Sequence, residues 1–332
     1  MVFVSMSFRF RIDVEAANMV ESVGNYSRHR VVPIIAQYYD GNGGLRYELT
    51  YLPAISGQSL ANAFSRALTD IALSRNHPVC DMCRNYEKIG GFPKRPTLSD
   101  NDSIDKRVKE CIVEDVTGFM ATKGGERGEV IKRTSKIWFS YMIPDADSIK
   151  HAPPIPQFHV RYSTNENEQM IFSIESGSAI YRVKIAIDID SIGKLTDNKY
   201  VDNRLDRIND VFDALALMFN GYIGAKKARY LPQMEFLGGI ASISHPYRFM
   251  VTPAKAKLVK DRLESWYLYD TVTRATRFLS IFGNKVRLSI YYADKEFNTL
   301  LASKDITIEG ADSLEDLISK VRNSVQKLIE TK

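Results

Sequence analysis

Residues 3–14 have the sequence FVSMSFRFRIDV, in which apolar and polar side chains alternate. Successive side chains of a β-strand point to opposite faces, so this alternation predicts a half-buried strand. The apolar face contains Val4, Met6, Phe8, Phe10, Ile12 and Val14. The other face offers Arg9 and Arg11. We therefore expect Phe8 and Phe10 to lie in the core rather than on an open sheet surface that stacks nucleic-acid bases.

The segments that follow predict the rest of the fold. Residues 31–39 and 45–52 are strand-like and joined by the hairpin sequence Asp40–Gly44. Beyond Pro53 the apolar spacing becomes helical, with Ser56 at the N-cap position. Further predicted elements are strands at 137–143 and 178–190, a helix at 205–219 and a strand at 236–244. Apart from the hairpin, this order is βαββαβ, which indicates an α+β fold with a modified ferredoxin-like or RNA-recognition core.

The domain organisation predicted from this order is a single domain, residues 1–332. Its core comprises about 1–75, 131–145 and 176–250, and the stretches 76–130 and 145–175 are insertions. Residues 251–332 form a C-terminal helix-strand-helix addition. Its first helix is expected to begin at Pro253, its strand to span 286–292, and its last helix to start at the capping box Ser313–Asp316.

Composition narrows the class of protein. The chain has 332 residues, 44% of them apolar, which is enough for a sizeable core. Three cysteines do not make a disulfide framework. No apolar stretch approaches the roughly 20 residues that span a membrane, and the charged first strand is unlike a signal peptide. We expect a soluble cytoplasmic protein with no membrane partner.

Positive charge is concentrated in one window. Residues 221–262 carry eight Lys or Arg and two acidic residues, a net +6, whereas the rest of the chain is −1. Such a concentration is typical of a protein that binds a polyanion, although a solvated helix face plus a basic turn would look the same.

Motifs of common enzymes are missing from the sequence. The chain has no Walker A loop and no Gly-x-Gly-x-x-Gly after a strand, and its five histidines are scattered. We therefore expect no catalytic site.

Four segments have the chemistry to hold an RNA backbone. Basic and polar side chains, glycines and helix-start N–H groups all suit phosphate oxygens. The first segment contains Asn25, Arg28, His29 and Arg30, and the second Ser56, Gly57, Gln58 and Ser59. The third contains Lys123, Arg127, Lys132 and Arg133. The fourth, called here the basic segment, contains Lys226, Lys227 and Arg229.

One half-motif suits a metal ion. His77, Cys80 and Cys83 are spaced by two residues each, and Cys111 follows farther on, so these four could form a structural zinc site. The alternative is that they are small buried side chains. No other cofactor is expected.

Several stretches, in order along the chain, resemble one known family. They are residues 20–30, 53–61, 78–83, 141–144, 156–162 and 224–232. The chain resembles the CRISPR-associated, crRNA-binding backbone subunits of the archaeal type I-A Cascade complex, in the DevR-type branch of the RAMP superfamily. The resemblance covers the first strand to about Pro232.

The resemblance implies an antiviral protein that does not catalyse. It would bind CRISPR RNA, self-associate along it as a helical filament, join other Cascade subunits and present the spacer for pairing with target DNA. It also makes His159, with the neighbouring Arg161, a candidate for RNA binding.

Two other hypotheses remain open. The first is a RAMP-superfamily endoribonuclease that uses Glu21, His29 or His159, because related RNA-targeting complexes carry an acidic catalytic residue after the first strand. The second is an unrelated metabolic α+β protein.

Overall fold

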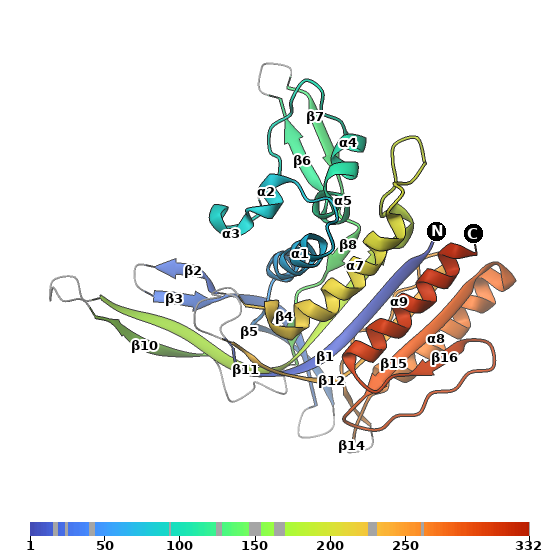
Figure 1. Cartoon of the computed structure of the whole chain (residues 1–332). Coiled ribbons are helices and arrows are strands. Elements are labelled where there is room, and N and C mark those ends of the chain that lie inside the picture. The colour runs from blue at the N-terminus through green and yellow to red at the C-terminus, as the bar shows by residue number, and fades with distance from the viewer. Residues whose placement is uncertain are drawn as a thin grey trace.

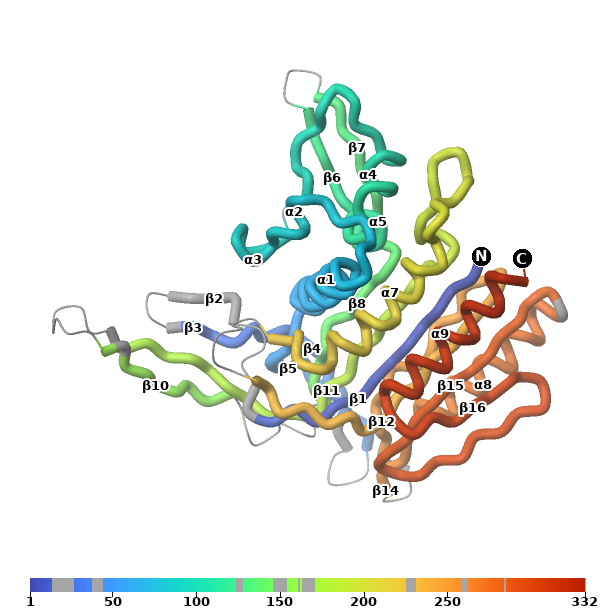
Figure 2. The backbone as a smooth tube through the Cα atoms, viewed as in Figure 1, coloured from blue at the N-terminus to red at the C-terminus, as the bar shows by residue number. Residues whose placement is uncertain are grey.

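The computed structural model of the chain has an α+β fold, with one large mixed sheet covered by helices on both faces (Figure 1, Figure 2). The residues that the structure describes are 1–15, 19–23, 26–39, 44–92, 94–123, 128–145, 154–162, 170–224, 231–259 and 262–331. Among these residues, no helix is long and apolar enough to cross a membrane.

The sheet is organised around its first strand. Strand β1 (Phe3–Glu15) pairs antiparallel with β11 (Met170–Asp188) on one side and with β12 (Gln233–His245) on the other. The main path has the order β16-β15-β12-β1-β11-β3-β2, and β8, β9 and β10 also pair with β11. The remaining strands of this sheet are β2 (Met19–Val23), β3 (Tyr26–His29), β8 (Ile137–Phe139), β9 (Ile143–Pro144), β10 (Ile155–Arg161), β15 (Arg287–Asp294) and β16 (Thr307–Gly310).

The alternation of β1 is confirmed on its apolar face, where Phe8 and Phe10 are almost fully buried. The prediction for the opposite face was wrong at Arg9, which is also buried and bonded to Glu296 at 2.5 Å. The hydroxyls of Ser5 and Ser7 on this second face accept hydrogen bonds from the backbone N–H groups of Val251 and Ala254. The chain between 251 and 254 therefore covers the second face.

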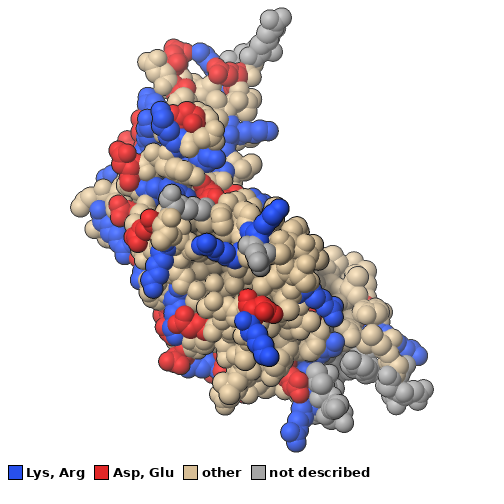
Figure 3. Space-filling view, turned by 90° about the vertical axis from the view of Figure 1, so that its right-hand side faces the viewer, with Lys and Arg blue, Asp and Glu red and all other residues tan. Residues whose placement is uncertain are grey.

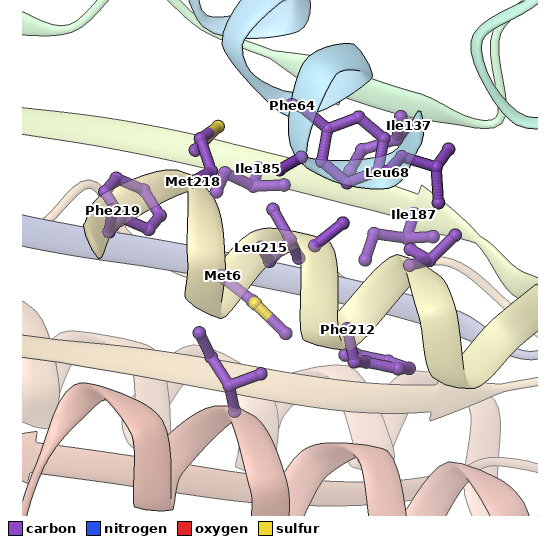
Figure 4. Close-up of a cluster of buried hydrophobic side chains, with 14 of the residues drawn as sticks. Met6, Phe64, Leu68, Ile137, Ile185, Ile187, Phe212, Leu215, Met218 and Phe219 are labelled. Atoms are coloured by element: carbon purple, nitrogen blue, oxygen red, sulfur yellow. The ribbon is translucent and has the colours of Figure 1, made fainter. Parts of the chain in front are cut away.

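Three helices cover the apolar face of β1: α1 (Gly57–Ser74), α7 (Arg204–Leu217) and α9 (Leu314–Glu330). Their inward side chains meet those of β1 and β11 in one core, part of which is drawn in Figure 4. The predicted N-caps are confirmed, because Ser56 Oγ accepts from Ser59 N and Ser313 Oγ accepts from Asp316 N. A short π-helical turn, η3 (Met218–Tyr222), follows α7.

A second, smaller core lies on the other face of β12 and β15. It is built with α8 (Trp266–Phe282), followed by the 3-10 turn η4 (Gly283–Lys285). The helix expected at Pro253 was wrong, because the short strands β13 (Lys257–Val259) and β14 (Arg262–Glu264) precede α8. A further 3-10 turn, η2 (Ile189–Ser191), follows β11.

Residues 76–92, 94–123 and 128–133 form the part at the top of Figure 1. Its elements are α2 (Asp81–Arg84), α3 (Tyr86–Ile89), α4 (Ile104–Glu110), α5 (Ile112–Thr117), β6 (Phe119–Thr122) and β7 (Val130–Arg133). Buried charge connects this part to α7, since Arg207 Nη1 lies 2.9 Å from Asp115 Oδ2 and both side chains are inaccessible to solvent.

Two hairpin-like pairs expose many apolar side chains. The predicted hairpin is confirmed as β4 (Val31–Tyr39) and β5 (Leu45–Pro53), although residues 40–43 of its turn lie outside the described residues. The pair β10–β11 extends to the left in Figure 1. Exposed apolar residues on these two pairs include Ile35, Tyr47, Leu49, Tyr51, Phe158 and Ile171.

Candidate nucleic-acid interface

The first predicted RNA-binding segment is divided between surface and interior. Asn25 lies outside the described residues, and Arg28 is exposed on β3. His29 is only 2% exposed, and its backbone N–H donates to Glu175 Oε2 at 2.9 Å. The ring Nδ1 of His29 also lies 3.0 Å from the carbonyl oxygen of the half-buried Arg30. Of the three described members of this segment, Arg28 is thus the most exposed to a phosphate.

The second segment forms the first turn of α1. Ser56 is buried as the N-cap, and Gln58 is exposed. A Cβ atom on Gly57 would lie 2.6 Å from the carbonyl oxygen of Phe139, so only glycine lets the helix approach β8 this closely. The positive end of the helix dipole and this exposed amide are suited to an anionic group.

A groove of about 510 Å³ runs along this helix start. One wall is α1, with the exposed amides of Gln58 and Asn62, and the opposite wall is β8 and the residues around it. Lys94 lines the groove while its Nζ donates to the carbonyl oxygens of Thr117, at 3.1 Å, and Gly118. Burial lowers the pKa of Lys94.

Two aromatic residues at this groove were missed by the sequence analysis. Trp138 on β8 is 39% exposed and Tyr141 is 37% exposed, and both residues border the groove. Ile137 and Phe139 on either side of Trp138 pack toward α1, so strand alternation turns the Trp138 ring to the opposite face of the sheet. The guanidinium of Arg248 lies 5.5 Å from the Trp138 ring centre, which brings a positive charge to the tryptophan from a distant part of the chain. Alternation within 137–143 could have indicated that Trp138 points outward, but nothing local indicates the groove.

In the third segment, Arg133 has a different role from the predicted one. Lys132 is exposed, and Lys123 is paired with Asp100 at 2.6 Å on the surface. Arg133, in contrast, is largely buried: it is ion-paired with Asp115 and donates to the carbonyl oxygens of residues 191 and 194. The expectation that Arg133 faces RNA therefore conflicts with its position. Arg127 lies outside the described residues.

The remaining predicted RNA contacts are only partly described. The basic segment (Lys226, Lys227 and Arg229) lies outside the described residues. The His159 ring stacks on Phe172 with 5.3 Å between ring centres. Arg161 is the last residue of β10, and its side chain lies outside the described part of the structure. By strand alternation His159 shares its face with Phe172, whereas Arg28 shares its face with Phe158. His159 and Arg28 therefore lie on opposite faces of the sheet.

The cysteines come together, and the predicted histidine does not join them. The Sγ atoms of Cys80, Cys83 and Cys111 all lie within 4.8 Å of one another. His77 instead bonds through Nδ1 to Asp210 Oδ2 at 2.5 Å, because Arg75 and His77 at the end of α1 pair with the carboxylates of α7. The expected Cys3His set is thus corrected to a group of three cysteines.

Several basic side chains elsewhere are paired with acidic ones. On the face shown in Figure 3, Lys and Arg alternate with Asp and Glu along one edge. On α9, for example, Lys320 lies 3.0 Å from Asp316, and Arg322 lies 2.5 Å from Asp213 of α7. Mutual neutralisation weakens the attraction of such paired side chains for a polyanion.

Comparisons with known proteins give a consistent result. A family model described as CRISPR-associated negative auto-regulator DevR/Csa2 matches residues 6–264. The chain is 35% identical to "CRISPR-associated protein Cas7/Csa2 1" of Saccharolobus solfataricus, over 89% of this chain and 93% of that protein. It is 31% identical to "CRISPR-associated aCascade subunit Cas7/Csa2 2" of the same organism, over 76% of this chain and 82% of that protein. A solved chain of a "CRISPR RNA-guided surveillance complex" aligns with a TM-score of 0.49 and 12% identity, covering 97% of this chain and 99% of that chain.

Proposed function

Because this chain belongs to the CRISPR-associated DevR/Csa2 family, we propose that it is a guide-RNA-binding subunit that forms the backbone of a CRISPR interference complex. The name of one relative, an aCascade subunit, supports membership of a multi-subunit assembly of that kind. In this proposal several copies of the chain line up along one CRISPR RNA and contact the other subunits of the complex.

We also propose that the core is a modified ferredoxin-like fold of the RNA-recognition type. Support comes from the strand order β12-β1-β11-β8, in which every neighbouring pair is antiparallel. Helix α1 lies between β1 and β8 in the chain, and α7 lies between β11 and β12. This is the βαββαβ arrangement with both helices on one face of the sheet.

The observation that carries the RNA-binding proposal is the groove between α1 and β8. Its helix end attracts phosphate, and Tyr141 offers a partly exposed aromatic ring on which a base of single-stranded RNA can stack. An RNA held by its phosphates and by stacking keeps its base edges available for pairing. That is what presentation of a spacer to target DNA requires, and it allows any guide sequence.

Self-association is supported by the exposed apolar side chains of β4–β5 and β10–β11. Phe158 is 72% exposed, Ile35 73% and Tyr47 68%. Clusters of large exposed apolar residues on soluble proteins mark protein–protein contacts. We propose that these strands contact neighbouring copies in the filament.

We propose that the subunit does not cleave RNA. His29, one of the residues of the endoribonuclease hypothesis, is 2% exposed, which supports a structural role over contact with a substrate. His159 is stacked on Phe172. Glu21 is opposite Arg28 in the β2–β3 pair, and its side chain lies outside the described residues.

Two tyrosines provide a matched test, Tyr141 at the groove and Tyr269 on α8. Both are partly exposed, Tyr141 by 37% and Tyr269 by 46%. Base stacking on an aromatic side chain is worth about 1–3 kcal/mol, so Tyr141→Ala should weaken binding of single-stranded RNA roughly 5- to 150-fold. Tyr269→Ala should bind like the parent protein.

The measurement is fluorescence-anisotropy titration with unrelated RNA sequences at fixed salt, followed by electrophoresis of the recovered RNA. We expect similar affinities for all sequences, the loss specific to Tyr141→Ala in each, and intact RNA. Equal affinities of both variants, with unchanged unfolding temperatures, would contradict the groove as the RNA site. Discrete cuts that disappear in Glu21→Ala would instead support the endoribonuclease.

A further inference from the structure

Three cysteine side chains from two separate segments converge in the upper part of the molecule. The Sγ atoms of Cys80, Cys83 and Cys111 lie within 4.8 Å of one another. Cys80 precedes α2 and Cys83 lies within it, whereas Cys111 lies between α4 and α5. A backbone hydrogen bond of 2.9 Å from Ile112 N to Pro78 O joins the same two segments. Cys83 and Cys111 are fully buried, and Cys80 is half-buried.

The sulfur spacing fits a single metal ion. Zinc–sulfur bonds of about 2.3 Å in tetrahedral geometry separate the sulfurs by roughly 3.8 Å, so three atoms within 4.8 Å need only small adjustments. An iron–sulfur cube attaches each cysteine to a different iron atom and so needs wider spacing. A disulfide would use only two of the three thiols.

A backbone N–H donor and two cationic side chains lie around the cysteines. Cys111 Sγ accepts a hydrogen bond of 3.5 Å from Glu114 N. The charge of Lys94 interacts with all three cysteines, and the charge of Arg95 interacts with Cys80. Three thiolates and one divalent ion leave a net charge of −1, which the Lys94 ammonium offsets.

We propose that Cys80, Cys83 and Cys111 bind one Zn²⁺ ion as thiolates, a site that goes beyond the proposed RNA-binding function. The ion replaces three thiol protons, which pass to solvent, and it ties the segment after α1 to the α4–α5 junction. Solvent reaches the cluster at Cys80, so a water molecule supplies the fourth ligand. His77 is not a ligand, because Asp210 holds its ring.

The test measures metal directly. Protein prepared without added chelator should contain about one zinc per chain by mass spectrometry of metals, and replacement by Co²⁺ should give the strong visible bands of tetrahedral cobalt–thiolate coordination. Cys80→Ser, the half-buried position, should lose most of the zinc. His77→Gln, which keeps a donor for Asp210, should retain all of it and serves as the matched control.

A second measurement needs no variant and so does not depend on mutant folding. Stepwise modification of thiols in the parent protein should release zinc to a chromogenic chelator as the three cysteines react. Each of three results would overturn the proposal: parent protein that carries no zinc and takes up no Co²⁺, copper as the bound metal, or loss of the metal in His77→Gln. None of these readouts involves RNA, so their failure is distinguishable from failure of the RNA-binding function.

Discussion

The Asp102–Arg107 pair shows how single buried charges hold residues 76–133 together. The Arg107 side chain is fully buried and donates from Nε and Nη2 to Asp102 Oδ2 at 2.8 and 2.5 Å. The same guanidinium donates to the carbonyl oxygens of Arg95 and Thr97, at 2.5 and 2.8 Å. Burial opposes ionisation of Asp102, but the hydrogen bonds from Arg107 outweigh it, so the pKa of Asp102 lies below its usual value.

Asp102→Asn should therefore destabilise this part in a pH-dependent way. Hydrogen bonds to charged groups contribute about 1–3 kcal/mol each, and the variant loses the charge at neutral pH. A carboxyl with a lowered folded-state pKa stabilises above its unfolded value of about 4, and this stabilisation disappears as the pH falls through the folded pKa. Amide hydrogen exchange of residues 94–123 should show faster opening of the variant at pH 7 and a smaller difference in acid.

Asp100→Asn is the matched control. Asp100 is 87% exposed and pairs with Lys123 on the surface, so its replacement should change stability by only a few tenths of a kcal/mol at any pH. A pH-independent effect of Asp102→Asn, or an equal effect of Asp100→Asn, would show that the buried pair is not the source of acid sensitivity.

Burial of a charged residue is what the sequence could not predict. Lys132 and Arg133 are neighbours in a basic stretch, yet Lys132 is exposed and Arg133 is bonded to Asp115 and to carbonyl groups about sixty residues away. The position of His77 was also unpredictable from sequence, because its partner Asp210 lies on α7, far along the chain. Contacts made across such distances leave no local pattern. The cysteine positions, in contrast, were indicated by their spacing.

At the scale of elements, Gly57 determines how closely α1 approaches β8. Gly57→Ala would improve intrinsic helix propensity by up to about 1 kcal/mol. The added Cβ would, however, lie 2.6 Å from the Phe139 carbonyl oxygen, a backbone atom that cannot move alone. Overpacking of this kind costs about 1–3 kcal/mol, so we expect a lower unfolding temperature and weaker RNA binding at the groove.

Gly91→Ala controls for the substitution itself. No atom lies within 4 Å of the position of its added Cβ, so the unfolding temperature and RNA affinity should remain those of the parent. Calorimetry and RNA titration of both variants would show whether the loss of stability and of RNA affinity is specific to Gly57→Ala. A Gly57→Ala protein as stable as Gly91→Ala would mean that α1 can shift away from β8 without cost.

Elements with a local signal were predicted well. The alternation of residues 3–14, the helix spacing after Pro53 and the caps Ser56 and Ser313 depend only on neighbours in sequence, and all are confirmed. The helix expected at Pro253 failed because the segment there extends along β1 and donates to Ser5 and Ser7. A partner about 250 residues away decided its conformation.

At the scale of the whole molecule, the distribution of charge is the property that a long RNA would sense. The window 221–262 carries a net +6, whereas on α9 Lys320 and Arg322 are paired with acidic residues. In the proposed filament, a continuous RNA would cross several copies and join them through its phosphates. Loss of phosphate contacts should then weaken both binding and assembly, whereas loss of unrelated charges should not.

Replacing all three residues of the basic segment by Ala should therefore weaken the salt dependence of RNA binding. The slope of the logarithm of the binding constant against the logarithm of the salt concentration should fall in magnitude by about 2, equally for all RNA sequences. It should also shorten RNA-dependent filaments in electron micrographs. The control triple variant Lys285→Ala, Lys295→Ala and Lys304→Ala removes the same charge from exposed positions in the C-terminal part. Because that part is not expected to lie along the RNA, the control should keep the parent's slope and filament length. Equal losses in both variants would mean that net charge, and not an RNA path through the basic segment, governs assembly.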